Sequence, residues 1–101
     1  MVNTKYNFKI DDKVIESDIN RLTNQLWKLI PMREKEENWL EHLKSVIIEI
    51  AGLNEIFAEN VNYLILLSKL EGLKNNDEIE FNLYRKTIFE SISLLRGIMH
   101  D

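Results

Sequence analysis

Apolar residues recur along most of this 101-residue chain at the three- and four-residue spacing that places side chains on one face of a helix. The first run extends from about Asp12 to Ile30, and Pro31 is expected to end the helix there. Its apolar stripe consists of Ile15, Ile19, Leu22, Leu26 and Leu29. The pattern therefore predicts a first helix over residues 12–30.

A second apolar stripe begins after this proline and keeps its phase over a long stretch. It consists of Trp39, Leu43, Val46, Ile50, Leu53, Phe57, Val61, Leu64 and Leu67. Acidic residues open the run, which suits the positive end of a helix that starts near Met32: Glu34, Glu36 and Glu37.

Two interpretations of this stretch compete. The sequence Gly52-Leu53-Asn54 has the composition of a helix stop followed by a new cap, which predicts four helices. The unbroken phase favours one long helix over residues 32–71, because a mid-helix glycine costs only about 1 kcal/mol. We favour the long helix and keep a break near Gly52 as the alternative.

A last helix follows a polar turn. Gly72 and the cluster from Lys74 to Asp77 predict the turn, and Asp77 with Glu80 has the spacing of a capping box. The apolar stripe of this helix is Phe81, Tyr84, Ile88, Ile92, Leu95 and Met99.

The N-terminal segment has a different pattern, because residues 5–10 alternate between polar and apolar side chains. We expect an extended arm over residues 1–11, packed across the helices or around a partner subunit. The predicted fold is a small all-α bundle in a single domain of residues 1–101. It has three helices with one long central helix, or four helices if the chain breaks near Gly52.

Charge and composition exclude several classes of function. The formal net charge of −4 and a pI near 5.2 disfavour general binding to nucleic acids and anionic membranes. The absence of cysteine excludes disulfides and thiolate chemistry. The N-terminus lacks a secretory pattern, and the apolar stretch over residues 45–70 carries glutamates that are costly in hydrocarbon. We expect a cytoplasmic protein without a membrane span.

The sequence contains none of the common catalytic motifs, and we expect a non-enzymatic protein without cofactor or metal. The acidic run after Pro31 lacks the Glu-x-x-His spacing of di-metal bundles, because Leu40 follows Glu37 by three residues. Glu49 lies beside the apolar stripe, so we expect it to pair across a helix interface. Trp27 and Trp39 flank Pro31, and packing at the end of the bundle is their expected role. An aromatic clamp for a ligand is the alternative role.

One flank of the last helix combines positive charge with an aromatic ring. Its residues, spaced at four, four, three and four positions, are Arg85, Phe89, Ser93, Arg96 and His100. Guanidinium groups bind phosphate and an aromatic ring stacks on a base, so this flank is a candidate site for an anionic ligand. Salt bridges to glutamates of a neighbouring helix are the competing interpretation.

The Arg96 and His100 pair superficially resembles the Arg and His pair of the HEPN superfamily, helical ribonucleases that also use a late helix of an all-α bundle. In that family more residues separate the pair than the three found here, and Gly97 follows the arginine. We therefore expect no ribonuclease activity.

A surplus of apolar residues is the strongest indication of function. Beyond the main stripe, the central segment carries a second apolar set, Ile56, Tyr63, Leu66, Leu70 and Leu73. A helix that is apolar on two sides is buried on two sides, which a small chain achieves most readily with a second subunit or a target protein.

We therefore expect a helical interaction protein that forms a homo-oligomer and binds a protein partner. Its small size and its Asn, Ile and Lys content suggest, by analogy, a bacterial or phage inhibitor or adaptor. The alternative is an oligomer that sequesters an anionic small ligand such as a nucleotide or cyclic dinucleotide.

Overall fold

The computed structural model describes residues 2–3, 9–56, 61–76 and 78–98. Its helices are α1 (Asp12–Glu34), α2 (Trp39–Ile56), α3 (Val61–Lys74) and α4 (Phe81–Ile98). Before them, β1 (Val2–Asn3) pairs antiparallel with β2 (Lys9–Ile10). The predicted all-α bundle is confirmed, in its four-helix form. Residues 1 and 4–8 of the expected arm lie outside the described residues.

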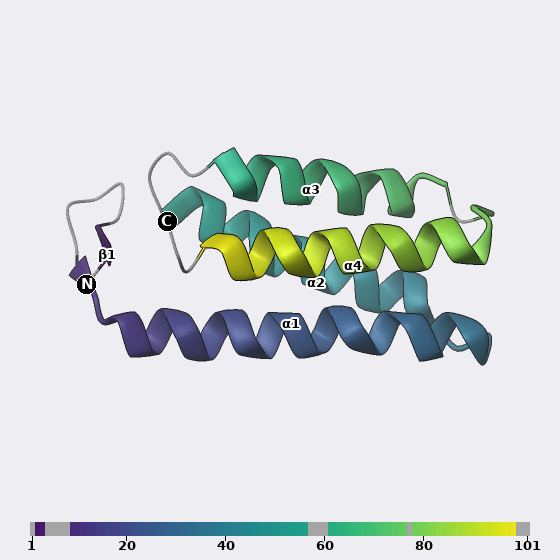
Figure 1. Ribbon diagram of the computed structural model, residues 1–101, viewed down its shortest axis with the longest axis horizontal. Coiled ribbons are helices and arrows are strands. Elements are labelled where there is room, and N and C mark those ends of the chain that lie inside the picture. The colour runs from purple at the N-terminus through teal and green to yellow at the C-terminus, as the bar shows by residue number, and fades with distance from the viewer. Residues whose placement is uncertain (1, 4–8, 57–60, 77, 99–101) are drawn as a thin grey trace.

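The helices lie side by side along the long axis of a molecule that measures 42 × 21 × 20 Å (Figure 1). Each helix packs on the helices before and after it in the chain, and α4 also packs on α1, which closes the ring. In Figure 1, α4 runs between α1 and α3, with α2 behind it. The buried side chains of all four helices form one hydrophobic cluster.

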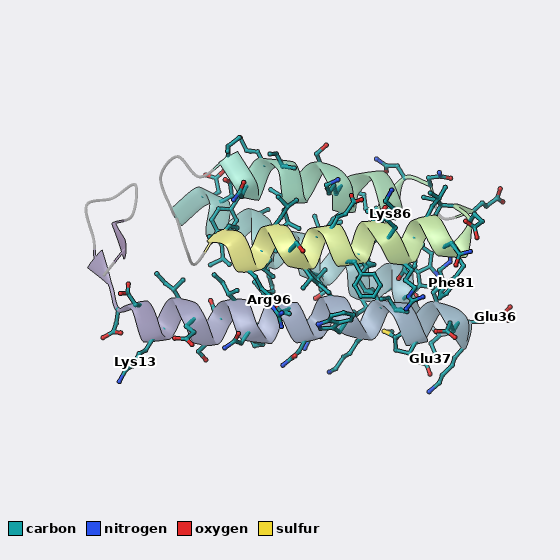
Figure 2. The ribbon with its side chains drawn as sticks, in the orientation of Figure 1. Lys13, Glu36, Glu37, Phe81, Lys86 and Arg96 are labelled. Atoms are coloured by element: carbon teal, nitrogen blue, oxygen red, sulfur yellow. The ribbon has the colours of Figure 1, made fainter. Side chains whose placement is uncertain are left out.

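The C-terminal end of α1 lies beyond its expected position. Pro31 is inside the helix, on its exposed side, and α1 continues to Glu34. The helix ends in a Schellman motif, because the N–H of Glu36 donates to the carbonyl of Arg33 at 3.1 Å and that of Glu37 donates to the carbonyl of Met32 at 2.8 Å. The acidic residues after the proline therefore end α1 and do not open a new helix. Glu36 and Glu37 lie at the tip of the bundle (Figure 2).

The single long central helix is a wrong prediction. Asn38 caps α2, accepting a hydrogen bond from the N–H of Glu41 at 3.4 Å, and α2 runs through Gly52 to Ile56. After residues 57–60, which are not described, α3 begins at Val61 and packs back on α2. Gly52 therefore lies inside α2, and the two helices separate between Ile56 and Val61, beyond the position expected for a break.

Folding back changes which side of α3 is buried. Val61 and Leu64, which continue the predicted stripe, are 62% and 57% exposed. The buried side chains of α3 are those of Tyr63, Leu66, Leu70 and Leu73. Burial of each of these side chains stabilises the fold by about 2 kcal/mol. Together they outweigh the few helical hydrogen bonds that are lost where the chain turns back. Gly72 lies inside α3, not past its end.

The helix α4 begins four residues later than the expected cap. Glu80 is the cap, because its carboxylate accepts hydrogen bonds from the N–H groups of Asn82 at 3.0 Å and Leu83 at 3.3 Å. The predicted cap, Asp77, lies outside the described residues. The expected stripe is confirmed from Tyr84 to Leu95, and Met99 also lies outside the described residues.

Arg33 connects three helices at the end of the bundle that holds the α1–α2 connection. Arg33 of α1 lies over the rings of Tyr84, at 4.6 Å, and Trp39, at 5.5 Å, and it donates to the carbonyl of Ile79. The Tyr84 hydroxyl donates to the carbonyl of Leu29 at 2.8 Å. These contacts link α1, α2 and α4 and hold the start of α4 in place against α1.

Candidate functional site

The basic flank of α4 is partly assembled as the sequence predicts. The guanidinium of Arg85 lies over the ring of Phe89, with 5.2 Å between its carbon and the ring centroid. Phe89 is 39% exposed, which leaves much of a large aromatic side chain open to solvent. The cation–π contact orders the guanidinium plane while its N–H groups remain available for hydrogen bonds.

Trp27 of α1 joins this flank, which the sequence did not predict. Its ring meets that of Phe89 edge to face, with centroids 5.0 Å apart and an interplanar angle of 78°. Trp27 is 38% exposed. Trp39, the other tryptophan, packs instead on Tyr84 with centroids 5.1 Å apart. The position of Trp27 outside the apolar stripe of α1 was the signal available in the sequence.

Within the described ranges, neither arginine of this flank has a carboxylate partner. Arg85 and Arg96 are exposed, and neither forms an ion pair with a residue that the structure describes. Figure 2 shows Arg96 extending from α4 toward α1. The competing interpretation, in which glutamates neutralise these two arginines, is therefore not found within the described ranges. His100 lies outside them, so its relation to Arg96 is not described.

Glutamates elsewhere in the bundle are paired across helix interfaces. Glu49 binds Arg21 at 2.8 Å, which confirms the expected role of Glu49 and raises the pKa of the guanidinium. Glu90 binds Lys69 of α3 at 2.8 Å, and this hydrogen bond lowers the pKa of the carboxyl group. The acidic residue nearest in sequence to Phe89 is thus neutralised by a lysine of α3.

An open hollow of about 530 Å³ lies between α3 and α4. Its lining residues are Asn62, Lys69, Phe89, Glu90, Ser93, Leu94 and Gly97. Phe89 therefore lines the hollow and also forms the ring pair with Trp27. Ser93, a predicted member of the basic flank, lines the hollow, whereas neither arginine does.

The predicted interface residues are placed differently from the expectation. Tyr63, Leu66, Leu70 and Leu73 are at most 2% exposed within one chain, so they present no surface to a partner. These side chains pack in the hydrophobic core of the same chain. The side chain of Ile56 lies outside the described residues.

Other apolar side chains of α2 and α3 do reach the surface. On α3 they are Val61, Leu64 and Ile65, and we call these three residues the outer α3 face. Ile48 of α2, the helix beside α3, is 71% exposed. Val61 and Leu64, which the sequence pattern assigned to the core, thus lie on the exposed side of α3.

Among the described residues, no group of three or more His, Cys, Asp or Glu side chains is arranged to hold a metal ion. Within the same ranges, no helix is long and apolar enough to cross a membrane. No protein-family model, curated protein or solved structure matches the chain.

Proposed function

We propose that the chain is a non-enzymatic interaction protein that associates with other protein chains, including a second copy of itself, through the outer α3 face. The observation that carries this proposal is the exposure of Val61, Leu64 and Ile65 on consecutive turns of one helix. Exposed apolar side chains that gather on one element are typical of protein interfaces.

The charge pattern of α3 supports the same function. Residues 61–68 include no charged side chain. Charge is therefore absent from the exposed side of this segment as well as from its buried side. Interface cores are depleted of charge, whereas a helix face that is meant for solvent usually carries Lys or Glu. A symmetric pair of outer α3 faces would cover the exposed side chains of both copies.

The test is the size of the protein in solution. In sedimentation velocity at about 50 µM, the wild-type chain is expected to sediment as a dimer or a larger assembly. Val61→Glu and Leu64→Glu are expected to shift it toward monomer, because each places a charge in the apolar contact at a cost of about 2 kcal/mol or more. Their helix content, measured by circular dichroism, is expected to stay unchanged.

Val14→Glu is the matched control. Val14 lies in the first turn of α1, as Val61 lies in the first turn of α3, and the two are 58% and 62% exposed. The control variant is expected to associate like the wild type. A wild-type monomer at this concentration, or equal dissociation by Val14→Glu and Val61→Glu, would contradict self-association through the outer α3 face.

A further inference from the structure

A second surface, independent of the outer α3 face, lies where α4 packs on α1. It consists of the edge-to-face rings of Trp27 and Phe89, Arg85 on the Phe89 ring, and Arg96. We call these four residues the α1–α4 site. Both rings are more than one-third exposed, so each retains open aromatic surface.

The charges around this site favour an anion. Residues 19–27 of α1 and residues 85–89 of α4 include no carboxylate, and Arg21, the only cation of that α1 segment, is paired with Glu49 and Asp18. Glu90 is held by Lys69 of α3. The site is thus locally positive in a chain whose formal net charge is −4. An exposed arginine without a carboxylate partner can direct two parallel N–H groups of its guanidinium at phosphate oxygens.

The order of the groups along α4 indicates the shape of the ligand. Phe89 lies between the two arginines in sequence, and these are separated by 11 residues, about 16 Å along a helix. This separation of the two backbone positions suits a ligand with two phosphate groups better than a ligand with one. A ligand with a flat ring between two phosphates matches the sequence of cation, ring pair and cation.

We propose that the α1–α4 site binds a short phosphorylated nucleotide of dinucleotide length. A base stacks on the open surface of Trp27 and Phe89, and the phosphates on either side of it accept hydrogen bonds from Arg85 and Arg96. Stacking on an aromatic ring tolerates any base, so this arrangement selects for length and charge more than for base identity.

Trp27 provides the readout. In a Trp39→Phe background, Trp27 is the only tryptophan, and its fluorescence reports contacts at the site. Titration with the 5′-phosphorylated dinucleotide pApA at low salt is expected to quench this fluorescence saturably. Adenosine, which has only the ring, and inorganic tripolyphosphate, which has only the charge, are expected to bind at least about tenfold more weakly, because each lacks half of the contacts.

Arginine variants test the phosphate contacts. Arg85→Ala and Arg96→Ala are each expected to weaken pApA binding about tenfold, the effect of losing one charge-assisted hydrogen-bonding group. Lys86→Ala is the matched control, because it removes the same charge from α4 on the side away from α1 (Figure 2), and a change of less than about twofold is expected. Unchanged helix content and thermal stability show that all three variants are folded.

Three results would overturn the proposal: no saturable quenching by millimolar pApA, equal quenching by tripolyphosphate, or arginine variants that bind no more weakly than Lys86→Ala. None of these results depends on association through the outer α3 face. The two proposals therefore fail separately.

Discussion

At the scale of single residues, the buried polar groups of the core differ in how well they are satisfied. The Tyr84 hydroxyl donates to the carbonyl of Leu29, and the buried Ser91 hydroxyl donates to the carbonyl of Thr87 at 2.8 Å. Thr23 is 3% exposed, and its hydroxyl oxygen has no hydrogen-bond partner among the described residues. Such a group loses its water without replacement, which costs about 1–3 kcal/mol.

Thr23→Val is therefore expected to stabilise the protein by about 1 kcal/mol, because valine keeps the shape of threonine and removes the unpaired hydroxyl. The measurement is the free energy of unfolding from denaturant titration at unchanged slope. Thr87→Val is the control: the Thr87 hydroxyl donates to the carbonyl of Leu83 at 2.9 Å, so its removal is expected to give no gain. A destabilised Thr23→Val variant would show that the hydroxyl has a favourable partner.

Residue patterns also account for part of the α1–α4 site. The spacing of Arg85 and Phe89 was enough to predict that they share one side of α4, because they are one helical turn apart. Trp27 was not predicted to join them. Contacts between residues of different helices depend on how the helices are rotated and aligned, which spacing within one helix does not specify.

At the scale of helices, the end of α1 has a glutamate at a position that commonly holds glycine. The Schellman motif at the end of α1 requires a left-handed residue, which is commonly glycine. Here Glu36 occupies that position with φ of 57°. The sequence pattern therefore does not indicate this motif and predicts, at Pro31, a helix end that lies too early.

Glu36→Gly is expected to raise the free energy of unfolding by about 1 kcal/mol, because glycine adopts this backbone conformation without the strain that a Cβ atom causes. Thermal and denaturant unfolding measure the effect. Glu37→Gly removes the same charge at the next position, where φ is not positive, and is expected to give no stabilisation. A gain of equal size in both variants would assign the effect to charge and not to backbone strain.

The connection between α2 and α3 is another feature of this scale. The phase of the apolar stripe continues from Leu53 to Val61 and Leu64 as if one helix joined them. Helical periodicity records only which residues would share a face if the helix were continuous. It does not report the free energy that the chain gains by turning back and burying Tyr63 and Leu66 against its own core.

At the scale of the whole molecule, the bundle encloses two phenols whose ionisation opposes folding. Burial raises the pKa of Tyr63 to about 12, and burial also raises the pKa of Tyr84 above its ordinary value of 10. The unfolded chain therefore loses these protons at lower pH than the folded chain. The sign follows from linkage: stability is constant below pH 10 with respect to these groups and falls as the pH rises above it.

We expect the free energy of unfolding to decline between about pH 10 and pH 12. Unfolding at a series of pH values measures this decline, and phenolate absorbance follows the ionisation itself. Tyr84→Phe is expected to be less stable at pH 7, because the hydrogen bond to Leu29 is lost, and to show a shallower alkaline decline. An equal decline in the variant and the wild type would assign the alkaline effect to groups other than Tyr84.

The arrangement of the four helices also separates the two proposed surfaces. The outer α3 face belongs to a helix that packs on α2 and α4, whereas the α1–α4 site lies where α4 meets α1 (Figure 1). A partner on α3 and a ligand beside α1 therefore use different parts of the surface.

The apolar periodicity was sufficient to predict an all-α bundle, the buried stripes of α1 and α4, and the pairing of Glu49 across an interface. These features are local or follow from one helix face, because the 3.6-residue repeat assigns each side chain a direction. The reversal after α2, the burial of Tyr63 in place of Leu64 and the meeting of Trp27 with Phe89 emerged only in the folded chain. They depend on competition among alternative packings of whole helices, in which buried area outweighs the continuity of a local pattern.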